Sequence, residues 1–204
     1  MATKIAPTKG NLVSLTRSMK MAQSGHDLLD QKRQVLMMEL VRFMDSAKTI
    51  QSDVSKIFGE AYEALQKANV SLGIDTVEDI SESIPITNDI TVRLHSIMGV
   101  EIPDVDPLSD STVPCYSFLS SSGSMDEAYA QFRKVMALLA RLAEVETSVY
   151  RLANQIRKTH RRVNALEKIV IPADKEQIRF ISDVLDEGDR EDFTRMKLAQ
   201  KKHK

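Results

Sequence analysis

The sequence predicts an all-α dominated protein: a long antiparallel two-helix coiled-coil hairpin with a small central insert containing short β-strands. Apolar residues recur every seven positions along both the first and the last part of the 204-residue chain, which is the pattern of a left-handed coiled coil. Four of the six prolines lie between these two stretches. Aromatic residues make up only 5% of the chain and Trp is absent, so aliphatic and Met side chains must form most of the core.

The first predicted helix lies in an N-terminal segment, residues 1–72. Two seven-residue rows run along it, and their offset alternates between three and four positions, as the a and d positions of a coiled coil do. One row is Leu15, Ala22, Leu29, Leu36, Phe43, Ile50, Ile57 and Ala64, and the other is Leu12, Met19, His26, Arg33, Leu40, Ala47, Val54, Ala61 and Ala68. A helix from about Thr8 to Asn69 would be ~90 Å long. A helix of that length needs a partner along its apolar seam.

The partner is predicted in a C-terminal segment, residues 124–204. Its two rows are Ala128, Val135, Leu142, Val149, Ile156, Val163 and Val170, and Leu138, Val145, Leu152, Thr159 and Leu166. Pro172 has no backbone N–H, so we expect a kink near it. Beyond the kink the apolar positions shift to Ile178, Ile181, Leu185, Phe193 and Met196. The segment ends in a basic tail, residues 201–204.

The central insert, residues 73–123, changes period. Ile90 to Leu94 alternates as a half-buried strand does, and Val113 to Leu119 is a second strand candidate. We therefore expect a short β-hairpin and loops. The insert is also acidic, with nine acids against one base, Arg93, between Asp75 and Asp110.

Two seam positions carry polar residues. If Ala68 lies near Met125 when the helices fold back on each other, facing residue numbers add up to roughly 193, which brings Arg33 near His160 and His26 near Glu167. One interpretation is a polar layer of His26, Arg33 and Glu167 that sets the register. The other is that both seam side chains lie along the apolar surface and reach water.

Composition and motifs exclude several function classes. Lys and Arg number 28 against 29 Asp and Glu, for a formal net charge of -1, which argues against a uniformly basic nucleic-acid binder. The single cysteine, Cys115, excludes an intramolecular disulfide, and His26 with Asp27 and Asp30 is a poor set of metal ligands. No phosphate-binding glycine motif occurs, and Cys115 with His95 is a weak nucleophile–base pair. We therefore expect a non-enzyme with no cofactor and no metal.

The chain shows neither an apolar signal run at its start nor a stretch near the roughly 18 apolar residues of a membrane span. We expect a soluble, intracellular protein without direct membrane insertion. A basic run from Arg151 to Arg162 allows three interpretations: a solvated helix face, a nucleic-acid contact, for which only Tyr150 is near to stack on bases, or contact with an acidic protein groove. Met21 and Met38 fall on the outer face of the first helix. One interpretation is that Met is simply a good helix former, and the other is a soft apolar surface that can re-pack against changing neighbours.

Two blocks of residues, in order, carry a family resemblance. The first is Thr8-Lys9-Gly10-Asn11-Leu12, then Gly25-His26-Asp27-Leu28-Leu29 and Lys32-Arg33. The second is Arg161-Arg162-Val163-Asn164-Ala165-Leu166-Glu167, then Ile171-Pro172, Phe180-Ile181, Asp186-Glu187 and Arg190-Glu191-Asp192-Phe193. With Met98-Gly99-Val100 and Pro103 in the middle, the chain resembles the D subunit family of V-type and A-type rotary ATPases (ATP synthases). It departs from the family at Pro172-Ala173-Asp174 and in the Ser-rich stretch near Cys115.

The resemblance implies a central rotor shaft without catalytic residues of its own. Its paired termini would insert into a ring of catalytic and nucleotide-binding subunits, A and B. Its middle would bind the small F subunit of the stalk and the funnel-shaped subunit that caps the membrane rotor ring, at the cytoplasmic face of the membrane. The residues placed near the ring would be Arg17, Lys20, Met21, Arg190, Arg195 and Lys197.

Other classes remain open from the residues alone. An F-type γ subunit also pairs its terminal helices, but its middle is a full α/β domain, for which about 50 residues are too few. A cytosolic coiled-coil scaffold would explain the heptads but not the two motif blocks. A nucleic-acid-binding helical hairpin would use the basic run and would show steep salt dependence.

Overall fold

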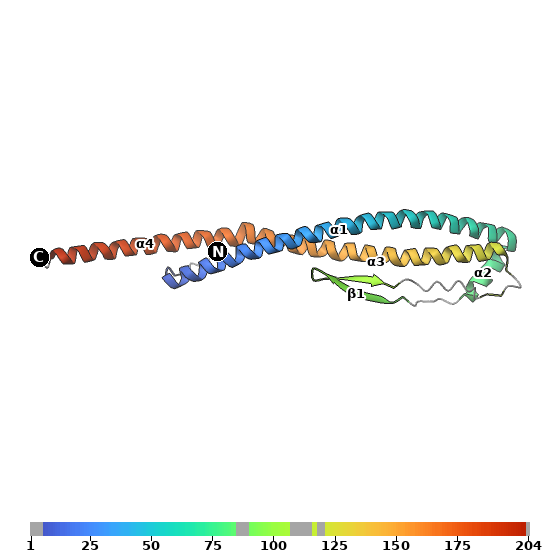
Figure 1. Ribbon diagram of the computed structural model, residues 1–204, viewed down its shortest axis with the longest axis horizontal. Helices are drawn as coiled ribbons and strands as arrows, with labels where there is room; N and C mark the ends of the chain where they lie inside the picture. Colours follow the sequence, from blue (N-terminus) through green and yellow to red (C-terminus); the bar gives the residue numbers. More distant parts are fainter. Residues whose placement is uncertain (1–5, 85–89, 107–115, 118–120, 203–204) are drawn as a thin grey trace. The chain divides into compact units, whose positions relative to one another are not determined.

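The computed structural model describes residues 6–84, 90–106, 116–117 and 121–202. Helices dominate, and the one two-stranded sheet of the described residues follows α1 and α2 in sequence and lies alongside α3 (Figure 1). This confirms the predicted fold class. In chain order the elements are α1 (Lys9–Leu72), α2 (Ile74–Ser83), β1 (Val92–Ile97), β2 (Val100–Val105), α3 (Gly123–Ala165), the π-helix η1 (Leu166–Val170) and α4 (Ile171–Lys202).

The chain divides into two compact units, and each combines a part of α1 with a part of the C-terminal half. The terminal unit contains Met1–Val35 with Ile156–Lys204, and the middle unit contains Leu36–Gln155. Segments so far apart in sequence can share a unit only because the chain folds back on itself.

In the terminal unit the helices run antiparallel. The Lys9 ammonium lies 3.5 Å from the Asp189 carboxylate, and Arg33 contacts His160 at 3.0 Å, so residue numbers rise along α1 as they fall along its partner. The second contact confirms the Arg33–His160 pairing expected from the register. No predicted seam residue of α1 in this unit is exposed, and Ile156, Val163 and Ile181 are buried.

The middle unit shows the same kind of pairing, with smaller residues at one end. The Tyr62 and Phe132 rings meet edge to face with centroids 5.8 Å apart, which joins α1 to α3. Their seam residues include the buried Leu36, Val54, Ala61, Ala64 and Ala68 of α1 and the buried Ala128, Val135, Val145 and Leu152 of α3. Alanines on the seam let two helix backbones approach closely. Every predicted seam residue of α1, from Leu12 to Ala68, is buried or half-buried.

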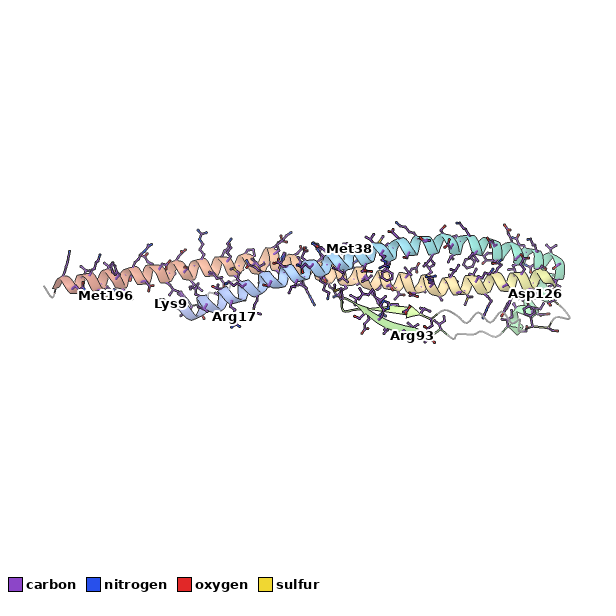
Figure 2. The ribbon with its side chains drawn as sticks, in the orientation of Figure 1. Lys9, Arg17, Met38, Arg93, Asp126 and Met196 are labelled. Carbon is purple, nitrogen blue, oxygen red and sulfur yellow. The ribbon has the colours of Figure 1, made fainter. Side chains whose placement is uncertain are left out.

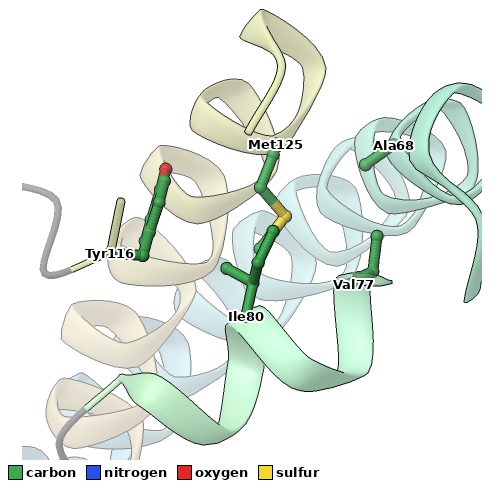
Figure 3. Close-up of a cluster of buried hydrophobic side chains, with 5 residues drawn as sticks. All are labelled: Ala68, Val77, Ile80, Tyr116 and Met125. Atoms are coloured by element: carbon green, nitrogen blue, oxygen red, sulfur yellow. The ribbon is translucent and has the colours of Figure 1, made fainter. Parts of the chain in front are cut away.

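α2 packs against the end of α1 and the start of α3. Figure 3 shows Ile80 and Met125 pointing toward each other, with Val77, Ala68 and Tyr116 around them. The Tyr116 hydroxyl donates a 2.6 Å hydrogen bond to Asp126 Oδ1. Ala68 and Met125 thus share one core cluster, which is the proximity on which the predicted register was based.

The insert contains the expected β-hairpin, but its burial differs from the prediction. β1 and β2 pair antiparallel around a two-residue turn, Met98 at φ 50° and Gly99 at φ 75°, as in a type I′ turn. The predicted half-buried strand Ile90 to Leu94 is wrong in its start and burial, since β1 begins at Val92 and is exposed up to Ser96. The buried residues belong to β2, because that strand faces α3. The second candidate, Val113 to Leu119, lies largely outside the described residues.

Two side chains of α3 attach the outer edge of β2. Asp106 N–H donates to Thr91 O, and the alternation of an antiparallel ladder then directs Glu101 O and Val105 N–H away from β1. Arg151 donates to Glu101 O at 3.0 Å, and Glu144 accepts from Val105 N–H at 3.3 Å. Pro103, between them, has no N–H to satisfy. α3 therefore satisfies two of the backbone groups on this edge, Glu101 O and Val105 N–H.

Near Pro172 the helix widens into η1. Ile171 N–H donates to Leu166 O, five residues back, which is the hydrogen bond of a π-helix. A wider turn just before a proline relieves the clash of its ring with the preceding backbone. The π-helix also shifts the seam, so Val170, expected on the unbroken row, is exposed instead.

Candidate functional site

The first half of the predicted ring contact lies on α1. Arg17, Lys20 and Met21 are all exposed, and Figure 2 labels Arg17 on this part of the helix. Across the described ranges neither cation takes part in an ion pair, so both are available to a partner. Their role stays a prediction.

The second half lies on α4, where each predicted cation already has a local partner. Arg190 lies 3.5 Å from Glu187, Arg195 lies 3.3 Å from Glu191, and the Lys197 ammonium stands 4.7 Å above the Phe193 ring. The two ion pairs are exposed and lie within one helix, and such pairs are worth about 0.3–0.5 kcal/mol each. Such weak pairs can be exchanged for contacts with another molecule at little cost.

The end of α4 exposes apolar residues that sequence reasoning placed on the seam. Phe193 and Met196 are 55% and 61% exposed, which corrects that expectation. The reason lies in the register: Lys9, the first residue of α1, already reaches Asp189. The part of α4 beyond Asp189 therefore has no described residue of α1 opposite it. Its apolar positions form a surface open to a partner.

The polar seam position Arg33 lies in a network across the helix pair. Its guanidinium lies 2.6 Å from Asp30 Oδ1 and 3.0 Å from His160 Nδ1. Because arginine can only donate, His160 Nδ1 accepts this hydrogen bond. The Asn164 side chain lies 3.1 Å from the other ring nitrogen, Nε2. Asp30 was missed as a partner, although its spacing of three residues from Arg33 on a helix could have suggested it.

His26 and Glu167, the other two members of the predicted layer, do not form an ion pair with each other in the structure. His26 Nδ1 lies 3.1 Å from the neighbouring Asp27 carboxylate, and Glu167 is exposed in η1. The structure shows no ion pair between His26 and Glu167, both of which it describes. The cross-helix polar contact therefore forms at Arg33 and not at His26.

The described side chains form neither a metal centre nor a membrane span. No group of three or more His, Cys, Asp or Glu residues among them is arranged to hold a metal ion. None of the helices described has the length and apolarity needed to cross a membrane.

Comparison with known proteins gives full-length matches. The family model for the D subunit of ATP synthase matches residues 11–201. The chain is 43% identical to the D subunit of the V-type ATP synthase of Thermotoga neapolitana over 198 residues, covering 97% of this chain and 98% of that protein. It is 41% identical to the D subunit of the A-type ATP synthase of Pyrococcus furiosus over 197 residues, covering 95% of this chain and 92% of that protein.

Proposed function

Because this chain belongs to the family of ATP synthase D subunits, we propose that it is a non-catalytic central-stalk subunit of a V/A-type rotary ATPase. In this role it transmits torque between the ring that handles ATP and the membrane rotor that translocates ions. Its partners are the A and B subunits of the ring, the small F subunit of the stalk and the funnel-shaped subunit above the membrane rotor. The complex holds it at the cytoplasmic face of the membrane.

The observation that carries the proposal is the burial of the α1 seam within each unit. All predicted seam residues of α1 are at least half-buried, including the fully buried Leu36. Interlocked side chains along such a seam make two helices bend and twist as one body. A single helix would curve under load, whereas a torque-bearing element needs this stiffness in each of its units.

Unequal faces support the same role. The terminal unit presents cations and Met21 on α1 but acid–base pairs and aromatic Phe193 on α4. A shaft with different faces meets each ring subunit with a different surface at each angle. Each face can then favour one conformation of its neighbour over another.

The middle unit supplies separate surfaces for the remaining partners. The attachments of Arg151 and Glu144 hold the hairpin on α3, and α2 caps the helix turn. Both are rigid features on one unit, which suits binding of stalk subunits that must rotate with the shaft.

Co-purification tests the proposal. The tagged full-length chain should capture the A and B subunits together with the F subunit from cells that express the whole complex. A complex assembled without the chain should hydrolyse ATP without driving ion transport. Capture of none of these subunits, or full coupling without the chain, would overturn the proposal.

The predicted ring contacts need a separate test. Arg190→Glu with Arg195→Glu should lower the ratio of ions moved to ATP hydrolysed, because both charges are reversed on the surface proposed to face the ring. A matched control, Lys56→Glu with Lys67→Glu, makes the same charge change at exposed positions of the middle unit. Unchanged coupling in the Arg190→Glu, Arg195→Glu variant would contradict the contact assignment but would not contradict the stalk role.

A further inference from the structure

The β-hairpin of the middle unit has an outer edge on β1 as well as on β2. Asp106 N–H donates to Thr91 O, so these two residues form a hydrogen-bonded pair of the ladder. Bonded and non-bonded pairs alternate in an antiparallel ladder, and every second residue of β1 therefore directs its N–H and C=O away from β2. These residues are Val92, Leu94 and Ser96.

The two outer edges differ in how their backbone groups are satisfied. On β2, side chains of α3 bond Glu101 O and Val105 N–H. On β1, no residue that the structure describes bonds the outward groups of Val92, Leu94 or Ser96. The edge of β1 therefore presents a row of backbone donors and acceptors that lack partners among the described residues.

This edge also lacks the features that usually prevent strands from pairing. Native proteins block an exposed edge with a charged residue, a proline or a bulge. The outward positions of β1 are valine, leucine and serine, and the strand pairs with β2 residue for residue, without a bulge. The side chains of Val92 and Leu94 are 53% and 59% exposed. An edge of this kind is a template for one more strand.

We propose that this edge pairs with β1 of a second copy of the chain, antiparallel and with Leu94 on the two-fold axis. In this register Leu94 faces Leu94 of the second copy, and Val92 faces its Ser96. Every outward N–H and C=O of both strands then has a partner. A register centred on Arg93 or His95 would leave one outward residue of each strand without a partner in the opposite strand.

The charges of β1 are compatible with this pairing. The strand contains no acid, although the insert around it is acidic. Its single arginine, Arg93, lies 2.9 Å from Asp106 of the same hairpin, and in the proposed register it faces His95 of the second copy. Like charges directly opposite each other would destabilise a strand pair. The register centred on Leu94 avoids them, whereas a register centred on Arg93 would place two guanidinium groups together.

The dimer should be weak and reversible. Pairing along β1 involves far fewer residues than the roughly 20–30 a side of a stable interface. The equilibrium between monomer and dimer therefore depends on protein concentration. This pairing does not depend on the stalk function, because it concerns the chain free of other subunits.

Sedimentation equilibrium of the full-length chain without partners, from about 1 μM to about 500 μM, measures the pairing. Leu94→Pro removes the outward N–H at the axis but no hydrogen bond within the hairpin, and proline is accepted at such edge positions. Leu94→Lys places two ammonium groups opposite each other. Each variant should keep the melting temperature of the wild type and raise the dimer dissociation constant about tenfold or more.

Two matched variants control for side-chain and charge effects. Leu94→Val keeps an apolar side chain and all backbone groups, so it should dimerise as the wild type does. Val70 is 89% exposed on α1 of the middle unit. Val70→Lys therefore adds the same charge away from the hairpin and should leave dimerisation unchanged.

Amide hydrogen exchange locates the contact. Raising the protein concentration should slow exchange at Val92, Leu94 and Ser96, whose N–H groups become bonded only in the dimer. Exchange at His95 should not respond, because its N–H already points to β2. Self-association through the exposed apolar residues of the long helices would not produce this alternation.

Three results would overturn the inference. The first is a monomer at every concentration, and the second is equal dimerisation of the wild type and both Leu94 variants, which would place the contact on another surface. The third is a monomeric chain whose capture of a different subunit is weakened by Leu94→Pro. That result would assign the edge to a strand of another protein.

Discussion

Replacing Arg33 tests whether the polar position on the seam contributes stability or only specificity. The Arg33 and Asp30 side chains are 32% and 28% exposed, so their ion pair is partly screened and contributes about 1 kcal/mol or less. The hydrogen bond to His160 adds about 1 kcal/mol. Arg33→Ala should therefore lower the free energy of unfolding by about 2 kcal/mol.

Arg33→Leu should behave differently. A leucine at this seam position would regain about 1–2 kcal/mol by partial burial, and Asp30 would keep access to water. The leucine variant should then lie within about 1 kcal/mol of the wild type. A polar residue on a coiled-coil seam contributes register more than stability.

Urea unfolding of the isolated chain, followed by far-ultraviolet circular dichroism, measures both variants. Arg42→Leu is a matched control, because Arg42 is exposed on the same helix and its replacement should change stability by less than about 0.5 kcal/mol. A loss of more than about 2 kcal/mol in the Arg33→Leu variant would refute the reasoning, since it would show that the polar network stabilises the seam more than an apolar side chain can.

Burial and backbone geometry give three further predictions. Leu36 is 0% exposed, whereas Leu28 on the same helix is 66% exposed. In urea unfolding, Leu36→Ala should lower the free energy of unfolding by about 2–5 kcal/mol and Leu28→Ala by less than about 0.5 kcal/mol. Equal losses would contradict the assignment of Leu36 to the seam. Burial, followed by the hydrogen bond to Asp126, raises the pKa of Tyr116. Its stabilising contribution should be complete below about pH 10 and lost as the pH rises above that value, where the unfolded chain ionises first; a Tyr116→Phe variant whose stability falls equally steeply with pH would disprove this. Gly99 has φ 75°, so Gly99→Ala should cost about 1 kcal/mol and speed hydrogen exchange of the hairpin amides roughly fivefold, whereas unchanged exchange would refute the turn assignment.

The pairing of the helices could be predicted because it depends on a repeated local signal. A seven-residue period places each seam residue on the same side of a helix, and the shortest fold-back then determines which residues meet. Once Ala68 is set near Met125, the pairing of Arg33 with His160 follows from that geometry. The outward positions of Met21 and Met38 follow in the same way.

The errors share a different cause. β1 was expected to be half-buried because its residues alternate, but burial of a strand depends on what packs against it, and α3 packs against β2. His26 was expected near Glu167, but Glu167 is exposed within the π-helix and His26 contacts the neighbouring Asp27. Phe193 and Met196 carry the seam pattern, yet no described residue of α1 extends opposite them.

From the sequence alone came the two long helices, their antiparallel pairing, the acidic hairpin insert and the resemblance to a rotary ATPase subunit. All of these rest on periodicity and motifs, which act over short distances along the chain. The tertiary structure decided which polar seam residue finds a partner, which strand is covered and where α4 loses its neighbour. Those outcomes depend on the spatial ends of the elements and on contacts between residues distant in sequence, which no local pattern encodes.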